Sequence, residues 1–250
     1  MRLGILGGGR AAWAFGSAWA RVGWPLAGVW LRPESKSRIP ELLNTPRRTI
    51  EELAATSELI LVAVTDRAVA EVLARIPATE ALVFHASGAL PSPPDGFSLH
   101  PLKSLPPVGE RSDLDDTLLV FEGKHRKTAR LLAAAIGARL AEVTAEQKPL
   151  YHAAAVFGSN YVAAMLDIAE TVINRAGVPD ARGDLAALAR SAIMNWADHT
   201  DTRRFTGPAI RGDQETIRGH IEAVGSDAQV AQIYKLLAEW IASCNVATPK

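Results

Sequence analysis

A glycine-rich turn near the N-terminus constrains the fold more than any other feature of this sequence. Gly4 to Leu6 is a short apolar run, and Gly7-Gly8-Gly9 follows it directly. From Arg10 to Val22, small and apolar residues recur at helical spacing. A strand, a glycine turn and a helix in this order carry the G-x-G-x-x-A fingerprint of dinucleotide-binding proteins. The alternative interpretation is a glycine-rich turn that holds no ligand.

The fingerprint gives each small residue of the turn a role. Gly7 permits the tight turn, Gly9 lets the backbone approach a pyrophosphate, and Ala12 allows the helix to pack closely. Free amides at the start of the helix face the bound anion. The predicted cofactor-binding residues of this turn are therefore Gly7, Gly9, Arg10, Ala11 and Ala12.

Strand-like and helix-like segments alternate through the first half of the chain. Further apolar runs with strand character cover residues 26–31, 59–64, 81–86, 97–99, 117–122 and 139–143. Helical segments lie between several of them, at residues 50–55 and 68–75. This alternation predicts a Rossmann-like, doubly wound α/β sheet over residues 1–144.

The second half of the chain is predicted to be all helical. Alanine and leucine repeat at helical spacing through long segments from about Lys124 onward. The predicted helices are 124–136, 146–176, 183–200 and 214–244, the last broken at Gly225-Ser226. The predicted helical domain comprises residues 145–250.

Charge and cysteine content exclude several classes of protein. The 250-residue chain has 27 basic and 27 acidic side chains and no net charge, which argues against nucleic-acid binding and polybasic membrane attachment. Cys244 is the single cysteine, which excludes an internal disulfide and fits a cytoplasmic location. The six histidines show no metal-ligand spacing, so we predict no metal site.

One stretch of the second half is long and uncharged. It lies between Lys148 and Asp167 and includes histidine, serine, asparagine and tyrosine. We interpret it as a buried helix and not as a membrane span. The opening residues show no export signal.

The end of the second predicted strand bears on the choice of nucleotide. It reads Trp30-Leu31-Arg32-Pro33, without the carboxylate that NAD-selective sites place there. Arg32 is suited to bind a 2′-phosphate, which favours NADP over NAD. A solvated basic loop is the alternative, and the nearby Glu34 keeps NAD open.

Two further strand ends supply residues for the nicotinamide region. Both end at the carboxyl edge of the predicted sheet, where a nicotinamide lies in such folds. Asp66 has an alternative role as a helix N-cap, and His85 as a hydrogen-bonded polar residue at a strand end. The predicted lining residues are Val64, Thr65, Asp66, His85, Ser87 and Gly88.

Hydride transfer also needs a proton donor or acceptor for the reacting oxygen or nitrogen. His152 is the first candidate because an unperturbed imidazole titrates near neutral pH. Lys148 and Asn160 lie on the same predicted helix, and His100 is the second histidine candidate. A packed histidine at position 152, a backbone-bonded Asn160 and a loop histidine at position 100 are the alternatives.

Three longer segments carry a resemblance to a known family: residues 98–102, 148–161 and 206–213. Over residues 1–245 the chain resembles an uncharacterised bacterial family of Rossmann-like proteins with a C-terminal helical domain of unknown function. Its architecture is similar to the 6-phosphogluconate dehydrogenase-like superfamily, which includes pyrroline-5-carboxylate reductase, ketopantoate reductase and the β-hydroxyacid dehydrogenases. The resemblance implies a C-terminal domain like that of 6-phosphogluconate dehydrogenase and NADP-linked chemistry.

The family comparison transfers unevenly to individual residues. β-Hydroxyacid dehydrogenases use a lysine and an asparagine one helical turn apart, whereas Asn160 lies much further from Lys148. The segment from Thr206 to Asp213 resembles the proline-glycine segment of pyrroline-5-carboxylate reductase, which helps to build a pocket in a subunit pair. This implies a homodimer in which Thr206, Gly207, Arg211 and Asp213 contribute to the partner's substrate site. A salt bridge between Arg211 and Asp213, with Asp213 as a helix N-cap, is the alternative.

The sequence therefore predicts an NADP-dependent oxidoreductase that acts on a small carbonyl, hydroxyl or imine compound. The alternative is a dinucleotide-binding sensor or scaffold without turnover, which needs the phosphate site but no acid or base.

Overall fold

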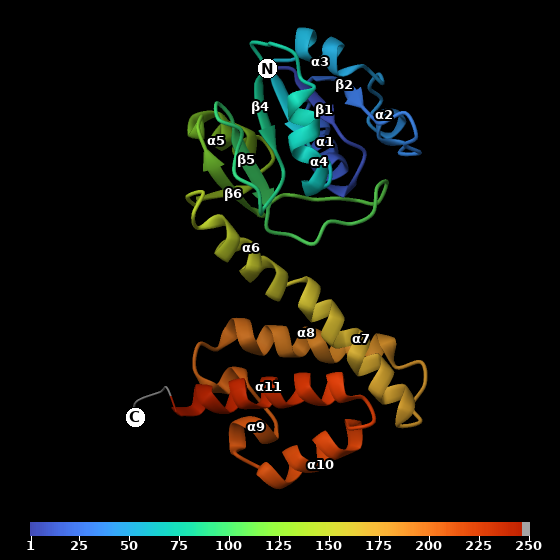
Figure 1. The fold of residues 1–250 in the computed structure, drawn as a ribbon, viewed down its shortest axis with the longest axis vertical. Coiled ribbons are helices and arrows are strands. Elements are labelled where there is room, and N and C mark those ends of the chain that lie inside the picture. The colour runs from blue at the N-terminus through green and yellow to red at the C-terminus, as the bar shows by residue number, and fades with distance from the viewer. Residues whose placement is uncertain (247–250) are drawn as a thin grey trace. The chain divides into compact units, whose positions relative to one another are not determined.

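The computed structural model describes residues 1–246, which form two compact units that divide after Ser159. The first unit contains the sheet, and the second is helical (Figure 1). The sequence places the boundary at 144/145, whereas the structure groups helix α6, Lys148–Phe157, with the first unit. The physical reason is Lys148, whose side chain is 2% exposed and inserts among residues of the sheet.

Seven strands form one sheet in the order β2-β1-β3-β4-β5-β6-β7. Strand β1 lies between β2 and β3 and is parallel to both, so the direction of winding changes there. The strands are β1 Leu3–Leu6, β2 Leu26–Trp30, β3 Leu59–Val62, β4 Leu82–His85, β5 Phe97–Pro101, β6 Leu118–Gly123 and β7 Arg139–Glu142.

The last two strands run against the other five. β6 is antiparallel to β5, and β7 is parallel to β6. The sequence predicts strands in both places but does not indicate this reversal. Residues 102–117 join β5 to β6 without a helix, and antiparallel neighbours do not need the helical crossover that parallel neighbours usually have.

Helices cover both faces of the sheet. Successive strand residues point to opposite faces, so Leu59 and Leu61 join one core while Ile60 and Val62 join the other. Helices α1 and α5 pack in the first core, and α3 and α4 in the second. The helices of this unit are α1 Arg10–Arg21, α2 Ile39–Leu42, α3 Ile50–Thr56, α4 Asp66–Ala74, α5 Arg126–Ala135 and α6.

Aromatic rings connect helix α1 to the middle of the sheet. Phe84 on β4 stacks on Phe97 of β5 with 4.6 Å between ring centroids, and Trp19 stacks on Phe15 at 4.9 Å. The edge of Trp19 meets Phe84 at 6.2 Å. Such rings bury a large apolar area, so they fix α1, and the glycine turn before it, against the strands.

The second unit is built from helices alone. Its last predicted break is confirmed, because α10 ends at Val224 and α11 begins at Ala228. The elements are α7 Asn160–Arg175, α8 Arg182–Asp198, the 3-10 turn η1 Thr202–Arg204, α9 Pro208–Arg211, α10 Gln214–Val224 and α11 Ala228–Val246.

The prediction of one helix over residues 146–176, with its uncharged stretch between Lys148 and Asp167 buried, is wrong in two respects. Gly158 and Ser159 interrupt it between α6 and α7, and neither α7 nor α8 has a buried residue within the single chain. By length and composition, Lys148–Arg175 is also long and apolar enough to cross a membrane, since an 18-residue window within it has a mean hydropathy of 1.2. The apolar surface of this stretch is thus left uncovered by its own chain.

Candidate functional site

The glycine turn leads from β1 into α1 as the fingerprint requires. Gly7 has a φ of +138°, and a side chain there would collide with the carbonyl oxygen of Ala63. Its amide donates a 3.0 Å hydrogen bond to the carbonyl of Trp30, which holds the turn against β2. Ala12 is fully buried, in agreement with close helix packing.

Gly9 differs from the other two glycines of the turn. It is exposed, it occupies the N-cap of α1, and no described atom lies within 4 Å of the position that its Cβ would take. A helix N-terminus with an open backbone position is the cradle that a pyrophosphate needs. Ala11 is half-buried in the first helical turn, and the exposed Arg10 donates to the carbonyl of Leu105 at 3.3 Å. These residues fit a dinucleotide.

Two arginines lie at the end of β2: the predicted Arg32, and Arg47, which the sequence analysis did not identify. Arg32 is exposed there, as a residue that meets a 2′-phosphate must be. The guanidinium of Arg47 donates to the carbonyls of Arg32 at 2.9 Å and Leu31 at 3.3 Å. Arg47 reaches this point because its backbone pairs with Val29 in an isolated bridge. No local motif signals such a bridge, so only the tertiary structure reveals it.

The end of β3 corrects one alternative. Thr65, not Asp66, occupies the N-cap of α4, and Asp66 is the first helical residue. Both side chains are exposed, and Val64 before them is half-buried. Asp66 is therefore placed at the carboxyl edge of β3 without a capping function.

His85 takes its structural alternative, a hydrogen-bonded residue at a strand end, and together with Ser87 it holds the loop after β4. The Nε2 atom of His85 lies 2.9 Å from the carbonyl of Pro91, and its Nδ1 atom accepts from the Ser87 amide at 3.2 Å. Burial lowers the pKa of His85, so the ring is neutral with its proton on Nε2. The Ser87 hydroxyl accepts from the amides of Ala89 and Leu90. Both residues thus shape this loop.

Gly88 in that loop lies against two histidine candidates. A Cβ at Gly88 would be 2.7 Å from Nδ1 of His152 and 3.0 Å from the ring of His100. The two imidazole rings meet edge to face, with 5.8 Å between their centroids. The Nδ1 atom of His152 is buried and has no hydrogen-bond partner among the described residues. The structure thus brings together two predicted catalytic residues and one predicted lining residue.

Tyr151 is the fourth member of this cluster. Its hydroxyl lies 2.5 Å from Nδ1 of His100. Burial, with smaller contributions from His152 and Lys148, lowers the pKa of His100 to about 4, and burial raises the pKa of Tyr151 to about 12. Both groups are therefore neutral at pH 7, with the phenol as donor and the imidazole as acceptor. The hydrogen bond between Tyr151 and His100 thus joins two neutral groups.

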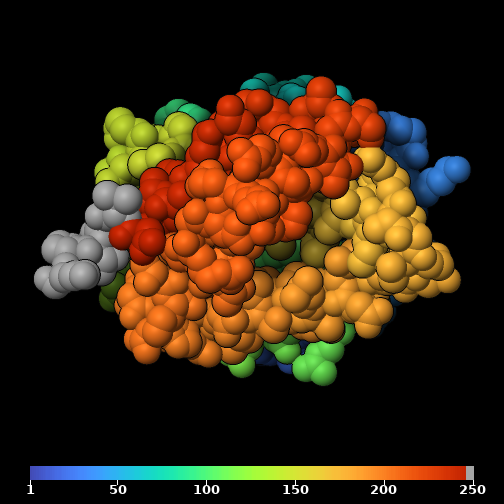
Figure 2. Space-filling model, turned by 90° about the horizontal axis from the view of Figure 1, so that it is seen from below, coloured from blue at the N-terminus to red at the C-terminus, as the bar shows by residue number. Residues whose placement is uncertain are grey.

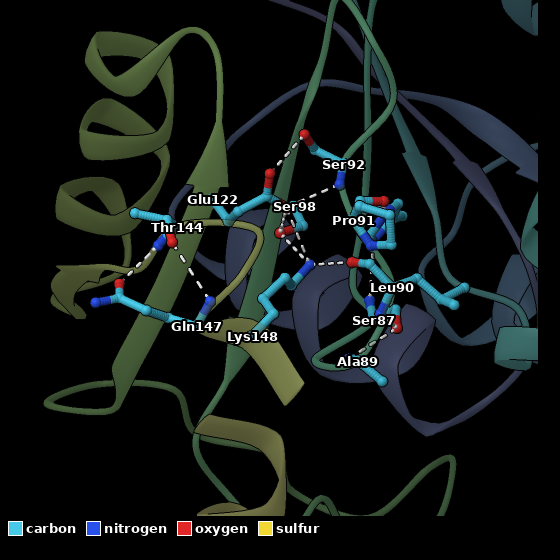
Figure 3. A network of polar contacts seen from close by, with 11 residues as sticks. Ser87, Ala89, Leu90, Pro91, Ser92, Ser98, Glu122, Thr144, Gln147 and Lys148 are labelled. Atoms are coloured by element: carbon cyan, nitrogen blue, oxygen red, sulfur yellow. Dashed lines mark hydrogen bonds and ion pairs between the residues drawn. The ribbon is translucent and has the colours of Figure 1, made fainter. Parts of the chain in front are cut away.

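Lys148 does not lie open to a substrate, contrary to the catalytic prediction. Its ammonium donates to Ser98 Oγ at 2.7 Å and to the carbonyl of Leu90, and it pairs with Glu122 at 3.3 Å (Figure 3). An ammonium has three protons, and these three partners account for all of them. Burial lowers the pKa of Lys148, and the charge of Glu122 opposes this shift. The structure assigns Lys148 to the interior of the protein.

The remaining predicted residues belong to the second unit. Asn160 begins α7. Thr206 is exposed, and Gly207 is the N-cap of the short helix α9 with a φ of +97°. Arg211 is exposed at the end of α9, and no described ion pair joins it to Asp213.

Asp213 takes its structural alternative. It caps α10, accepting from the Thr216 amide at 3.1 Å and from the Thr216 hydroxyl at 2.7 Å. The first half of the alternative, the salt bridge with Arg211, is not formed. Within residues 1–246, no three His, Cys, Asp or Glu side chains group as a metal site would require.

Comparison with protein families agrees with this architecture. Residues 1–93 match the model of a Rossmann-like domain, and residues 118–241 match the model of DUF2520, a domain of unknown function. The chain is a Rossmann-like domain joined to a DUF2520 domain. No curated protein matches it.

Several solved structures have a similar fold over nearly the whole chain, which includes both domains. A protein of Bacteroides fragilis described as an NADP oxidoreductase is 23% identical with a TM-score of 0.80, over 97% of this chain and 98% of that one. A protein of Thermotoga maritima is 19% identical with a TM-score of 0.76, over 98% of both chains. A reductive aminase of Aspergillus terreus, solved with NADPH, is 17% identical with a TM-score of 0.68, over 95% and 92%.

The low pKa of His100 makes the stability of the first unit depend on pH. The unfolded chain binds a proton at His100 below about pH 6.5, whereas the folded protein resists protonation down to about pH 4. Stability is therefore lost as pH falls through this window, by at most about 3 kcal/mol from this residue. We expect His100→Gln to reduce that loss in urea unfolding measured between pH 7 and pH 4.5.

His199→Gln is the matched control, because His199 lies in the other domain and bonds only its own turn. It should keep the pH dependence of the wild type. An unchanged pH dependence in His100→Gln would contradict the burial of a neutral His100.

Proposed function

We propose that the protein is an NADP-dependent oxidoreductase that transfers a hydride to or from a small carbonyl, hydroxyl or imine compound. The observation that carries this proposal is the placement of two features at one edge of the sheet. The open Gly9 follows the carboxyl end of β1, and His100 lies near the carboxyl end of β5, which runs parallel to β4, β3 and β1. Ligands of such folds bind at this edge.

The residues of the first unit divide between holding the nucleotide and moving a proton. Gly9 and the first amides of α1 would hold the pyrophosphate, and Arg32 would bind the 2′-phosphate that distinguishes NADP. When bound, the nicotinamide ring supplies or accepts the hydride. Solved structures of similar fold support this choice of cofactor, since their descriptions include an NADP oxidoreductase and a reductive aminase in complex with NADPH.

His152 is the residue we assign to proton transfer. A carbonyl or imine that gains a hydride at carbon must gain a proton at oxygen or nitrogen, and an alcohol loses both in the reverse direction. The Nδ1 atom of His152 has no described hydrogen-bond partner and lies against Gly88, which we expect to line the nicotinamide, so we assign the exchange of that proton to it. His100 and Tyr151 form the wall beside it and hold its surroundings neutral.

A dinucleotide-binding sensor is the second candidate function. It is favoured by the commitment of Lys148 to the interior, which removes one of the expected catalytic groups. A sensor of this kind would bind NADP at Gly9 and Arg32 and show no turnover.

We further propose that the protein is a homodimer assembled through the second unit. The hydrophobic cluster of this unit has three buried residues, Ala209, Ile217 and Ala238, and only Ala181 and Val224 are also buried among its described apolar residues. Helices α7 and α8 pack on each other, α9 to α11 form a second group, and Figure 2 shows a hollow between the two groups. Large apolar side chains stay exposed on these helices: Leu188, Ile193, Met194 and Trp196 on α8, and Leu236, Leu237 and Trp240 on α11.

A second copy fits this surface better than any other occupant. A monomeric protein seldom exposes so much apolar surface, and a subunit interface resembles a core divided between two chains. In such a dimer Thr206, Gly207 and Arg211 would contribute to the partner's substrate site, with Arg211 suited to a carboxylate. The same interface would cover the apolar stretch Lys148–Arg175 in a cytoplasmic protein.

Gly9→Val tests the nucleotide site. A side chain at this position meets no described atom and the φ of −95° is ordinary, so the protein should fold with nearly wild-type stability. The branched side chain would occupy the space of the pyrophosphate, and we expect NADPH affinity in calorimetry to fall by at least about tenfold. Arg32→Ala is the companion variant and should weaken NADPH more than NADH. Unchanged NADPH affinity in both variants, or no binding to the wild type, would contradict the proposed function.

Trp196→Glu tests the dimer. Trp196 is 64% exposed in the single chain, and a carboxylate there would be buried in the proposed interface. We expect the wild type to sediment as a dimer at micromolar concentration and the variant as a monomer. Leu131→Glu, at a 57% exposed position on α5, should leave the dimer intact. A wild type that sediments at 26.7 kDa would contradict the proposal.

A further inference from the structure

The Lys148–Glu122 pair is the most deeply buried charge pair of the described chain, and the proposed chemistry does not use it. The two side chains are 2% and 7% exposed. Burying two charges costs several kcal/mol, so such a pair is weak evidence for stability by itself. A role in fixing geometry is one established use of such pairs.

Both groups hold the loop that carries Gly88. Lys148 donates to the carbonyl of Leu90, and Glu122 accepts from the amide of Ser92 at 2.8 Å and from its hydroxyl at 3.0 Å (Figure 3). His85 adds its contact with Pro91. A loop without regular structure is thus held at three successive residues.

The pair also sets helix α6 in register with strand β5. Lys148 and Tyr151 are three residues apart on α6 and share one face of the helix. Ser98 and His100 are two residues apart on β5 and share one face of the strand. Lys148 bonds Ser98 and Tyr151 bonds His100, so helix and strand meet at two successive points. Glu122 stands opposite Ser98 on β6 and completes the first point.

The start of α6 is fixed from its other side as well. Thr144 and Gln147 form reciprocal side-chain to amide hydrogen bonds of 2.9 and 3.3 Å, as in a capping box. A rigid first turn means that the position of Lys148 decides where the next turn lies. That next turn carries Tyr151 and His152.

We propose that the Lys148–Glu122 pair is a positioning device that fixes α6 along β5 and the loop after β4, so that His152 faces Gly88 and Tyr151 meets His100. The pair acts through these residues and does not touch the substrate. Its use in catalysis rests on the proposed function, whereas its effect on geometry does not.

The titration of His100, followed by NMR of its ring, reports this geometry directly. The titratable or charged groups that face His100 are Tyr151 and His152 from α6, Lys148, and Asp66 from the start of α4. If α6 moves, Tyr151 leaves His100 and the ring gains solvent, so its midpoint rises from about 4 toward 6.5.

Three variants separate positioning from charge and from stability. Lys148→Met leaves Glu122 buried without its partner, so it should destabilise the protein and raise the His100 midpoint. The double variant Lys148→Met with Glu122→Gln no longer has an unpaired charge, so its stability should be restored. Leu90 and Ser98 still lack the ammonium that donates to them, so the His100 midpoint should stay raised. The single variant Glu122→Gln removes a negative charge. The loss of this charge by itself would leave the His100 midpoint unchanged or lower it, whereas a displacement of α6 would raise it.

Val72→Ala is the control for stability alone. Val72 is fully buried in the other core, and its truncation should weaken the protein without moving the His100 midpoint. A midpoint that stays near 4 in the double variant, or that does not rise in Glu122→Gln, would overturn the positioning role. Failure of the wild type to bind NADPH would refute the proposed function instead, and the His100 titration would still decide whether the pair positions α6.

Discussion

The parallel pairing of β1 between β2 and β3 is the constraint on which the rest of the molecule depends. It places the turn after β1 beside the ends of both neighbours, so that Gly7 bonds Trp30 and closes against Ala63. The aromatic contacts from Trp19 to Phe84 then fix α1 at the angle that leaves Gly9 open. An anion cradle and a cluster of polar residues consequently share one edge of the sheet.

The proposed chemistry at that edge uses neutral groups, and the buried charge pair lies behind them. Burial keeps His100 and Tyr151 uncharged at neutral pH, while the one buried ammonium of the described chain is paired with Glu122. In the proposed reaction the charge of the proton donor His152 falls by one unit when the substrate gains a hydride and a proton, while its neutral neighbours His100 and Tyr151 keep their charge. The buried pair lies one helical turn from the residues that would move the proton, close enough to hold them in place.

The sequence alone predicts the parts of this structure that follow local rules. The glycine turn, the first strands and the break at Gly225-Ser226 follow from spacing and composition, and all are present. The sequence-based predictions failed where contacts between residues far apart in the sequence determine the position of a side chain. Lys148 lies on the same predicted helix as His152, and only the position of Glu122 opposite Ser98 shows that its ammonium is turned inward. Arg47 and Tyr151 were missed because each reaches its partner across the fold. Burial was also expected for the uncharged stretch between Lys148 and Asp167, but no residue of α7 is buried within the described chain.

The proposed function requires the glycine turn and the histidine cluster to serve one bound nucleotide. A crystal structure of the protein grown with NADPH tests this requirement most directly. We expect the pyrophosphate on the amides that follow Gly9 and the nicotinamide ring beside Gly88, facing His152 across a space for a small substrate. A nicotinamide ring directed away from Gly88 and His152, or a cradle at Gly9 that stays empty at saturating NADPH, would contradict it.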